Sequence, residues 1–395
     1  MAAMRRVAIV GVGQTEYRHR RDDVMYPELV REAVGRALED AGLDVGDIDA
    51  AVLALAPDAL MGVAHAEHWV ADALGVRSKP YMRVNTGGST GITATQAAFS
   101  HVASGMFDCV LAAGADRVGE SGDAQLILNT MWDLLYERPF PLNAINMLAL
   151  QAVRYMHKYG TTEHHMALAA VKNRRHALRN PYAHLRREVT VEEVLASRVI
   201  CWPIKLYDAC PQSTGGCALI LCSEERARRL AGPKAWIIGV GNCAETYFMG
   251  DRMGPAAAHD HADADALAEA IARAYRMAGV RDPRREIDVA ELYAPFSNIE
   301  LHAIEAAKFC DKGQAGRLLE KGEFHLGSPL PVNASGGVLC ANPIAVTAMV
   351  RVAEAALQVR GRAGERQVEG ARTALATGIG GDHQFYGAMV LRGER

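Results

Sequence analysis

The chain contains Ala8-Ile9-Val10-Gly11-Val12-Gly13 near its start and Trp236-Ile237-Ile238-Gly239-Val240-Gly241 beyond its middle. Each stretch is a short apolar run with two glycines at matching positions. Each is followed by a helical stretch that ends in Ala-Gly, at Ala41-Gly42 and Ala278-Gly279. Ile237 follows Ile9 by 228 residues. A spacing this long indicates a duplicated domain, because the repeats of solenoids span only about 20–50 residues.

Two further pairs of segments match in the same order. They are Ile48-Asp49 with Ile287-Asp288, and Val84-Asn85 with Val332-Asn333. Each half thus alternates strand, helix, strand and a glycine-rich turn into a helix, which is typical of an α/β domain with a mixed or parallel sheet. We place the halves at 1–230 and 231–395, since Gly232-Pro233 breaks the chain. A segment at about 117–204 interrupts the first half.

Composition excludes several function classes. A formal charge of −3 over 395 residues gives no reason to expect nucleic acid or an anionic membrane as partner. The N-terminus runs directly into the first strand without an apolar signal segment, and no later apolar run is long enough to span a bilayer. The eight cysteines form no CxxC pair, so we expect reduced thiols, no metal site and a cytoplasmic protein.

The order and spacing of several motifs resemble the thiolase superfamily, closest to its sterol-carrier-protein-type and archaeal-type members, over essentially the whole chain. The resemblance implies an α/β fold of five layers, αβαβα, built from the two duplicated halves, and a homodimer. Its motifs are Arg6–Thr15, Ala103–Asp108, Leu111–Asp116, Leu206–Pro211, Gly313–Gly316 and Pro331–Gly337.

The sequence departs from the family at the four positions that react. The family's nucleophilic cysteine corresponds to Gly88, and its second cysteine to Gly378. Asn342 replaces the histidine of Gly-His-Pro, and Tyr293 replaces the asparagine or histidine of the Asn-Glu-Ala-Phe loop. A thiolase needs a thiolate and a histidine that activates it. Chemistry through an acyl-cysteine is therefore not expected.

Four remaining groups are candidates for catalysis. Tyr293 follows a strand and His383 lies on the turn that faces the acyl group in the family, so one would be the base and the other the acid. Asn342 would hold the thioester oxygen. Cys340 stands two residues before it and would face the pocket. The alternatives are a packed core aromatic for Tyr293, a structural histidine for His383 and a buried core thiol for Cys340.

Substrate binding is expected from the inserted segment. Its basic residues include Arg174, Arg175 and Arg179, which the resemblance implies could bind coenzyme A phosphates; the alternative is a solvated helix face. Ser89 is a further candidate for binding at the site. It is not expected to be a nucleophile, because no base is positioned for it, and it would cap the helix that begins near Thr90.

The expected function is retro-aldol cleavage of a β-hydroxyacyl-CoA, such as a steroid side chain, without an acyl-cysteine. The superfamily includes cysteine-less enzymes that do this with a separate small partner carrying a zinc ribbon and an OB-fold. Coenzyme A would enter as part of the substrate, with no tightly bound cofactor. The alternatives are a non-catalytic CoA-binding or scaffold subunit and a thiolase-type acyltransferase that moves acyl groups without a thioester intermediate on cysteine.

Overall fold

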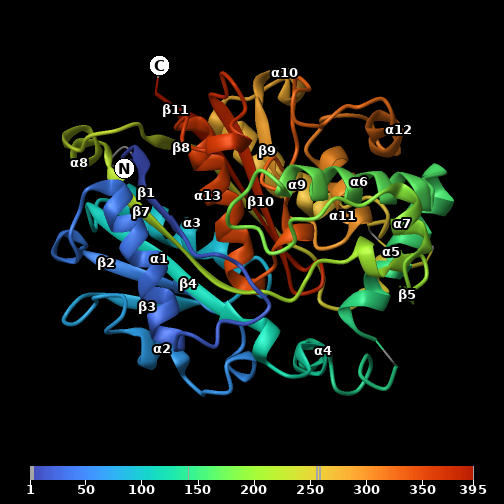
Figure 1. Cartoon of the computed structure of the whole chain (residues 1–395), viewed down its shortest axis with the longest axis horizontal. Helices are drawn as coiled ribbons and strands as arrows, with labels where there is room; N and C mark the ends of the chain where they lie inside the picture. The colour runs from blue at the N-terminus through green and yellow to red at the C-terminus, as the bar shows by residue number, and fades with distance from the viewer. Residues whose placement is uncertain (1–3, 141, 255–256, 258, 395) are drawn as a thin grey trace.

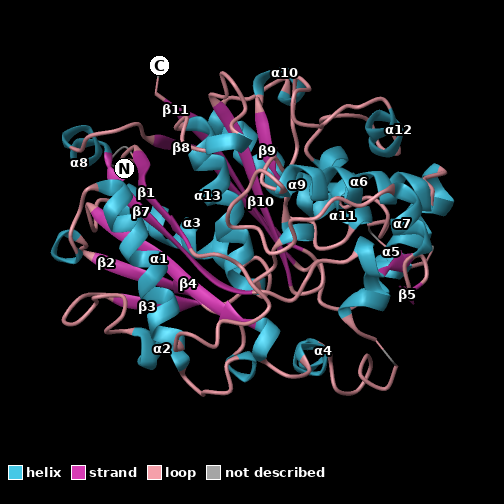
Figure 2. Cartoon of the chain, viewed as in Figure 1, coloured by secondary structure: helices cyan, strands magenta, loops and turns pink. Residues whose placement is uncertain are grey.

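The computed structural model describes residues 4–140, 142–254, 257 and 259–394. The main sheet of this part of the chain has the strand order β3-β2-β4-β7-β1-β8-β11-β10-β9 (Figures 1 and 2). The strands of the first half are β1 (Val7–Gln14), β2 (Ala50–Ala54), β3 (Tyr81–Val84), β4 (Cys109–Arg117) and β7 (Thr214–Ser223). Those of the second half are β8 (Ala235–Ala244), β9 (Val289–Glu291), β10 (Thr373–Gly380) and β11 (Phe385–Gly393).

The two halves meet at their first strands. β1 pairs antiparallel with β8 over Val7–Ile9 and Ala235–Ile237, so the two glycine-containing strands are direct neighbours. Each half contains one parallel pair of strands, β2 with β4 in the first half and β9 with β10 in the second. In each half the next strand is antiparallel: β7 pairs with β4, and β11 pairs with β10. This common pattern confirms the duplication.

Helices form three layers around the two parts of the sheet. α3 (Thr90–Ala103) and α13 (Thr347–Val359) pack against each other and against strands of both halves, so they form the middle layer (Figure 1). α1 (Tyr26–Ala41) covers the first half from outside, and α9 (Asp265–Ala278) covers the second. The arrangement is the α/β thiolase fold that the sequence predicted.

The paired glycines are explained by close packing of strand on helix. A Cβ on Gly11 or Gly13 would lie 2.3 or 2.0 Å from a carbonyl oxygen of α1, and one on Gly239 or Gly241 would lie 2.2 or 2.1 Å from a carbonyl oxygen of α9. These distances are shorter than van der Waals contact, so only glycine allows each helix to approach its strand this closely.

The segment between β4 and β7 is largely helical and carries α5 (Ala144–Tyr159), α6 (Glu163–Ala177) and the short ribbon of β5 (Val199–Cys201) and β6 (Ile204–Lys205). Met147, Tyr155 and Met156 lie in α5, and Trp132 lies in the loop before it. The limits of the inserted segment at about 117–204 and the boundary between the two halves at 230 stay predictions. The other helices are α2 (Ala66–Val70), α4 (Ala124–Leu128), α7 (Val191–Ala196), α8 (Glu224–Arg229), α10 (Pro283–Glu286), α11 (Ser297–Ala306) and α12 (Ala315–Glu320).

No helix in the described ranges combines the length and the apolar character needed to cross a bilayer.

Candidate functional site

The site is built around the start of α3, where Gly88 stands at the position of the family's nucleophile. A Cβ on Gly88 would lie 2.5 Å from the carbonyl oxygen of Ile379 and 2.5 Å from the hydroxyl oxygen of Tyr293. The phenol of Tyr293 therefore occupies the space in which a side chain at position 88 would stand. Free backbone N–H groups and the helix dipole make this end of a helix favourable for developing negative charge.

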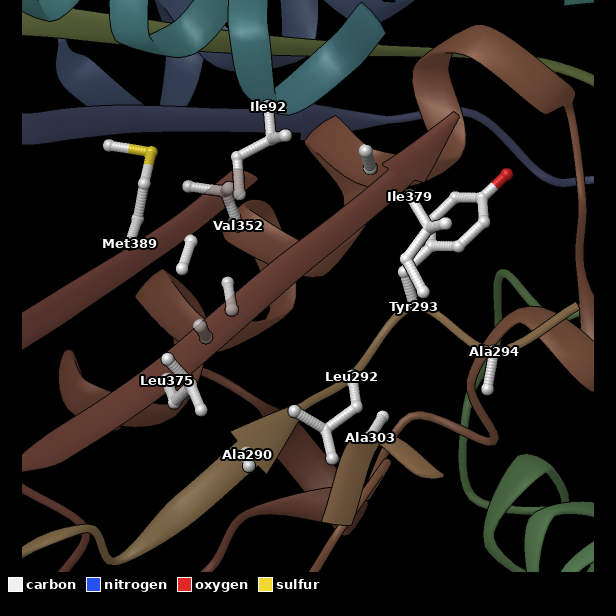
Figure 3. Packing of buried hydrophobic residues seen from close by; sticks show 14 of the residues in the cluster. Ile92, Ala290, Leu292, Tyr293, Ala294, Ala303, Val352, Leu375, Ile379 and Met389 are labelled. Carbon is white, nitrogen blue, oxygen red and sulfur yellow. The ribbon is translucent and has the colours of Figure 1, made fainter. Parts of the chain in front are cut away.

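The backbone of Tyr293 is fixed to the neighbouring strand β10. Tyr293 lies two residues beyond β9, and its backbone N–H donates to Thr377 Oγ1 on β10 at 2.9 Å. Figure 3 shows its ring beside Ile379, with the hydroxyl at the end of the side chain remote from Leu292. Burial raises the pKa of Tyr293 well above its ordinary value, and the neighbouring Cys210 and Asp116 raise this pKa further. The phenol is therefore protonated at neutral pH.

Asn342 has a fixed amide orientation. Its Oδ1 accepts the hydroxyl of Thr347 at 2.8 Å, and its Nδ2 lies 3.0 Å from Cys210 Sγ. Its backbone N–H donates to Ser213 Oγ at 3.0 Å. Within the described part of the chain, Cys210 Sγ is the one hydrogen-bond partner of Nδ2, so the second Nδ2 hydrogen is available to an oxygen acceptor. An amide fixed in this way can hold a thioester oxygen without reorganising.

The thiol beside Asn342 belongs to Cys210, which sequence reasoning missed. Cys340, the expected one, is fully buried in a cluster with Ala167, Ala170 and Leu339. The two residues on either side of Ala341 thus face different surroundings. Burial raises the pKa of Cys210 to about 11 and that of Cys340 to about 12, so neither is a thiolate at neutral pH.

The position of the family's second cysteine is also closed. A Cβ on Gly378 would lie 2.4 Å from Ile92 Cγ2 and 3.0 Å from Ala348 Cβ. The side chain of Ile92, which projects from α3 in Figure 3, therefore occupies the space in which a second thiol would have to stand. The site offers a phenol, an amide and one protonated thiol in place of the two cysteines and histidine of a thiolase.

His383 lies near this site but faces a separate buried cluster. Its turn touches the start of α3, because a Cβ on Gly87 would lie 2.8 Å from the backbone N of Gly381. The imidazole lies 3.4 Å from Gln151 Nε2, and its ring packs against those of His261 and Tyr386. Within the described part of the chain, its hydrogen-bond and ring contacts include neither Tyr293 nor Asn342. Burial lowers the pKa of His383 well below its ordinary value, so the ring is neutral.

Ser89 is fully buried and its hydroxyl donates to the carbonyl oxygen of Thr86 at 2.8 Å. α3 begins at Thr90 as expected, but the Ser89 side chain does not cap it. The reason is that the hydroxyl is already satisfied by the preceding turn. Ser89 therefore positions the turn that carries Gly88, and its proposed contact with substrate stays a prediction.

The three candidate arginines differ in accessibility. Arg174 is only 7% exposed and its guanidinium lies over the ring of Tyr207 at 5.8 Å, so it is part of the packing of α6. Arg175 and Arg179 are exposed, and neither forms an ion pair with any residue of the described ranges. Unpaired exposed guanidinium groups are suited to phosphate. The binding of coenzyme A phosphates stays a prediction for all three.

Asp116 joins the two halves at the site. Its carboxylate accepts the backbone N–H groups of Ala56 at 3.2 Å and Val346 at 3.1 Å, so it anchors the loop that carries Asn342. Burial raises the pKa of Asp116 to about 7. Among the described residues, the one group with ligand atoms close enough together to hold a metal ion is Asp58, His65 and Glu67. The Arg83 guanidinium already pairs with both carboxylates of this group at 2.6 Å.

Comparisons with known proteins identify the family of the chain. Residues 7–225 match the family of thiolase N-terminal domains, and residues 252–393 match the thiolase C-terminal domain-like family. The acetyl-CoA acetyltransferase of Methanothermobacter thermautotrophicus is 32% identical over 96% of this chain and 97% of its own length. Bovine sterol carrier protein 2 is 32% identical over 98% of this chain and 71% of its length.

Other relatives carry a different activity in their names. A steroid side-chain-cleaving aldolase of Thermomonospora curvata is 32% identical over 90% of both chains. The solved structure titled Ltp2-ChsH2(DUF35) aldolase superposes with a TM-score of 0.83 at 29% identity, covering 99% of this chain and 98% of that one. A monomeric SCP2-thiolase like protein from Mycobacterium smegmatis shares the fold, with a TM-score of 0.75 at 21% identity over 99% of this chain and 78% of that one. This chain belongs to the thiolase superfamily and is a thiolase-like protein of the sterol-carrier-protein type.

Proposed function

We propose that this protein is a carbon–carbon lyase that cleaves a β-hydroxyacyl-CoA by a retro-aldol reaction. The observation that carries the proposal is the Tyr293 hydroxyl at the place where position 88 would present a thiol. An oxygen acid–base group stands there instead of a nucleophile. Retro-aldol cleavage needs a proton-transfer group and a stabilised enolate, and needs no covalent acyl-enzyme.

The proposed reaction balances in protons. The bond between the α- and β-carbons breaks, and its electron pair passes to the α-carbon as an enolate whose oxygen is held by Asn342 Nδ2. The β-hydroxyl loses its proton and becomes the carbonyl of a ketone or aldehyde. The α-carbon then gains one proton, which gives a shortened acyl-CoA. One proton is lost and one is gained, so no oxidant or reductant is required.

Tyr293 is suited to be the acid. Because burial raises its pKa, the phenol begins protonated and can give its proton to the α-carbon after the carbon–carbon bond has broken. The proton taken from the β-hydroxyl by the base then returns to the phenol and completes the cycle. His383, whose ring is neutral and whose turn touches the start of α3, is the group that we propose as the base for the β-hydroxyl.

The substrate would be held as an acyl-CoA, with Arg175 and Arg179 near its phosphates and no tightly bound cofactor. The relative named as a steroid side-chain-cleaving aldolase supports a steroid-like acyl group. The relative whose title joins Ltp2 with ChsH2(DUF35) supports a small partner of the OB-fold and zinc-ribbon type. A homodimer in the cytoplasm is the assembly and compartment that we propose.

Some relatives are acetyltransferases, and an acyltransferase is therefore the rival enzyme. Acyl transfer through an acyl-cysteine would need a thiolate at the start of α3, where position 88 is glycine. Cys210, whose thiol lies beside Asn342, has a pKa raised to about 11 by burial and is a weak nucleophile. Acyl transfer without a cysteine intermediate stays the rival, and the products of the reaction distinguish it from the lyase.

The test is a single-turnover reaction with β-hydroxyacyl-CoAs of increasing size, with and without a candidate partner. Release of a ketone or aldehyde together with a shortened acyl-CoA would support the lyase. Free coenzyme A without a carbonyl product would indicate acyl transfer. Binding without turnover, partner included, would indicate a non-catalytic CoA-binding subunit.

A further inference from the structure

The end of strand β9 is held by a turn of the chain on the edge remote from β10. Val332 forms an isolated parallel bridge to Ala290 of β9, and the next residue, Asn333, donates its backbone N–H to the carbonyl oxygen of Ala290 at 2.7 Å. Leu292 and Tyr293 follow Ala290 closely along the chain (Figure 3). The turn at Asn333 therefore lies beside the strand end that carries the proposed acid.

The side chain of Asn333 makes the hydrogen bond that its backbone carbonyl would make in a regular parallel ladder. In such a ladder, a residue that donates its N–H to one carbonyl of the neighbouring strand also accepts, at its own carbonyl, the N–H two residues further along. Asn333 has a left-handed φ of 55°, and its carbonyl oxygen accepts the N–H of Gly336 at 2.9 Å. Asn333 Oδ1 takes the place of that carbonyl and accepts the N–H of Leu292 at 2.7 Å.

This hydrogen bond fixes the residue that precedes Tyr293. The pairing of β9 with β10 ends at Glu291, so the N–H of Leu292 lies beyond the ladder. The next N–H, that of Tyr293, donates to Thr377 Oγ1 on β10 at 2.9 Å. Two side chains, one on each edge, therefore hold the two residues that lead out of β9. Removal of the Asn333 amide would release the edge remote from β10.

The amide of Asn333 has one fixed orientation. Its Nδ2 donates to Oε2 of Glu300 at 2.6 Å, and its Oδ1 faces the N–H of Leu292. An ionised carboxylate only accepts hydrogen bonds and a backbone N–H only donates one, so an amide rotated by half a turn would oppose both partners. Glu300 thus determines which atom of Asn333 meets Leu292.

Helix α6 of the inserted segment holds Glu300 in turn. Lys172 Nζ lies 3.1 Å from Glu300 Oε1 and donates to the carbonyl oxygen of Val332 at 2.6 Å. Asn173 Nδ2 donates to Glu300 Oε2 at 2.6 Å. The side chains of Lys172 and Glu300 are fully buried, so salt in the solvent screens this pair little. A helix of the first half therefore contacts the residues that place Tyr293 in the second half.

We propose that Asn333 is a positioning residue for the phenol of Tyr293, and that Glu300 fixes the orientation of the Asn333 amide. The inference rests on the proposed function, in which Tyr293 is the acid. Asn333 acts through the backbone of Leu292, one residue before the phenol. A displacement of about 1 Å at a reacting group can lower a rate by about 10²-fold, so the hold on Leu292 bears on catalysis.

The test compares Asn333→Gly with the parent. Glycine adopts a φ of 55° without strain, so this variant loses the amide and keeps the turn. The single-turnover rate of cleavage of a β-hydroxyacyl-CoA should fall by roughly 10–100-fold. The Kd for the same acyl-CoA without its β-hydroxyl should change by less than about threefold, because the amide places the phenol and does not bind the nucleotide.

Gln358→Ala is the matched control. Gln358 is fully buried, and its Oε1 accepts a backbone N–H, that of Val368, at 2.8 Å. It lies near the end of α13, remote from Thr347, which begins this helix and donates to Asn342. Urea unfolding should show a loss of stability in both variants, whereas the rate should fall only in Asn333→Gly. An equal fall in Gln358→Ala would overturn the proposal.

A second pair of variants applies if Asn333→Gly does not fold. Asn333→Asp tolerates the left-handed backbone but sets a second carboxylate against Glu300, and should lower the rate at least about tenfold. Addition of Glu300→Gln exchanges donor and acceptor between the two positions and should restore the rate at least about fivefold. A rate that Glu300→Gln does not raise would overturn the role of Glu300.

A measurement without turnover separates this proposal from the lyase. In protein labelled with 3-fluorotyrosine, the fluorine resonance that is absent from Tyr293→Phe belongs to Tyr293, one of 12 tyrosines. This resonance should shift or broaden in Asn333→Gly and stay unchanged in Gln358→Ala. If the parent cleaves β-hydroxyacyl-CoA, a change in the rate alone or in the resonance alone, or in neither, overturns the positioning role while the lyase holds. If the parent cleaves nothing, the lyase fails, and the resonance alone decides whether Asn333 positions the phenol.

Discussion

The Tyr293 hydroxyl oxygen lies 2.5 Å from the point where a Cβ on Gly88 would stand, so the two residues share one space. Relative to the family pattern, the glycine and the tyrosine are therefore a coupled pair of changes. Loss of the side chain at 88 makes room for the phenol, and the phenol brings a proton-carrying oxygen to the start of α3. A side chain restored at 88 alone would collide with the phenol, whereas loss of the phenol alone would leave its space empty.

The first prediction concerns the hydroxyl of Tyr293. Tyr293→Phe keeps the ring and should lower single-turnover cleavage by roughly 10²–10⁴-fold, because general acid–base groups contribute about that much. Binding of acyl-CoA should change little. Tyr275→Phe is the matched control, since it also removes a buried hydroxyl, one that donates to Ala307 O at 3.0 Å far from the site. Equal rates in Tyr293→Phe and the parent would refute the assignment.

The second prediction concerns the space at position 88. Gly88→Ala should reduce both activity and stability, the latter by about 1–3 kcal/mol, because the new methyl meets the Ile379 carbonyl as well as the phenol. Gly35→Ala is the control: Gly35 is an exposed residue within α1 with no atom near its missing Cβ, and alanine there should stabilise by about 0.4–1 kcal/mol. Urea unfolding measures both. A Gly88→Ala protein as stable and active as the parent would contradict the shared space.

The fold was predictable because its determinants are local. The matched glycines of β1 and β8 mark close approach to a helix, and the family motifs carry the rest. The surroundings of the site residues depend on segments distant in sequence, and these were not predictable. Cys210 and Asn342 are 132 positions apart and meet only in the folded chain. The ring of Tyr207 that covers Arg174, and the imidazoles that surround His383, are likewise brought by tertiary packing.

The third prediction concerns the two exposed arginines that we propose bind the phosphates of the substrate. Changing both Arg175 and Arg179 to Glu should raise KM for an acyl-CoA by at least about tenfold and weaken the salt dependence of binding, since exposed arginines act on phosphate through charge. The turnover number should stay close to that of the parent. Arg229→Glu on α8 is the control for a charge change on an exposed arginine. If KM does not change, these arginines only face solvent.

The fourth prediction concerns the thiols. Because burial raises the pKa of Cys210 to about 11, iodoacetamide at pH 7 should react slowly and leave cleavage activity largely intact. Cys210→Ser should retain the rate within about threefold, since a hydroxyl can still accept from Asn342. Peptide mass mapping identifies the modified residue. Rapid inactivation that tracks modification of Cys210, with protection by acyl-CoA, would point to a catalytic thiol and against the phenol mechanism.

The last prediction is a stability effect of Asp382, whose carboxyl oxygen Oδ2 is buried without a partner in the described structure. Burial raises the pKa of Asp382 from 3.8 to about 7, so the native state holds its proton more tightly than the unfolded chain does. Stability from this group is therefore present at pH 4 and lost as the pH rises toward 7. Asp382→Asn removes the titration, and asparagine tolerates the backbone φ of 47° at this position.

The variant should exceed the parent in unfolding free energy by about 1–3 kcal/mol at pH 8, with the difference shrinking toward pH 4, since one pKa unit corresponds to about 1.4 kcal/mol. Part of the pH dependence should remain, because Asp116 also has a pKa raised to about 7 by burial. Urea unfolding at pH 4, 6 and 8 measures the effect, with exposed Asp251→Asn as the control. A difference from the parent that does not change with pH would show that the Asp382 carboxyl is not destabilised when it ionises.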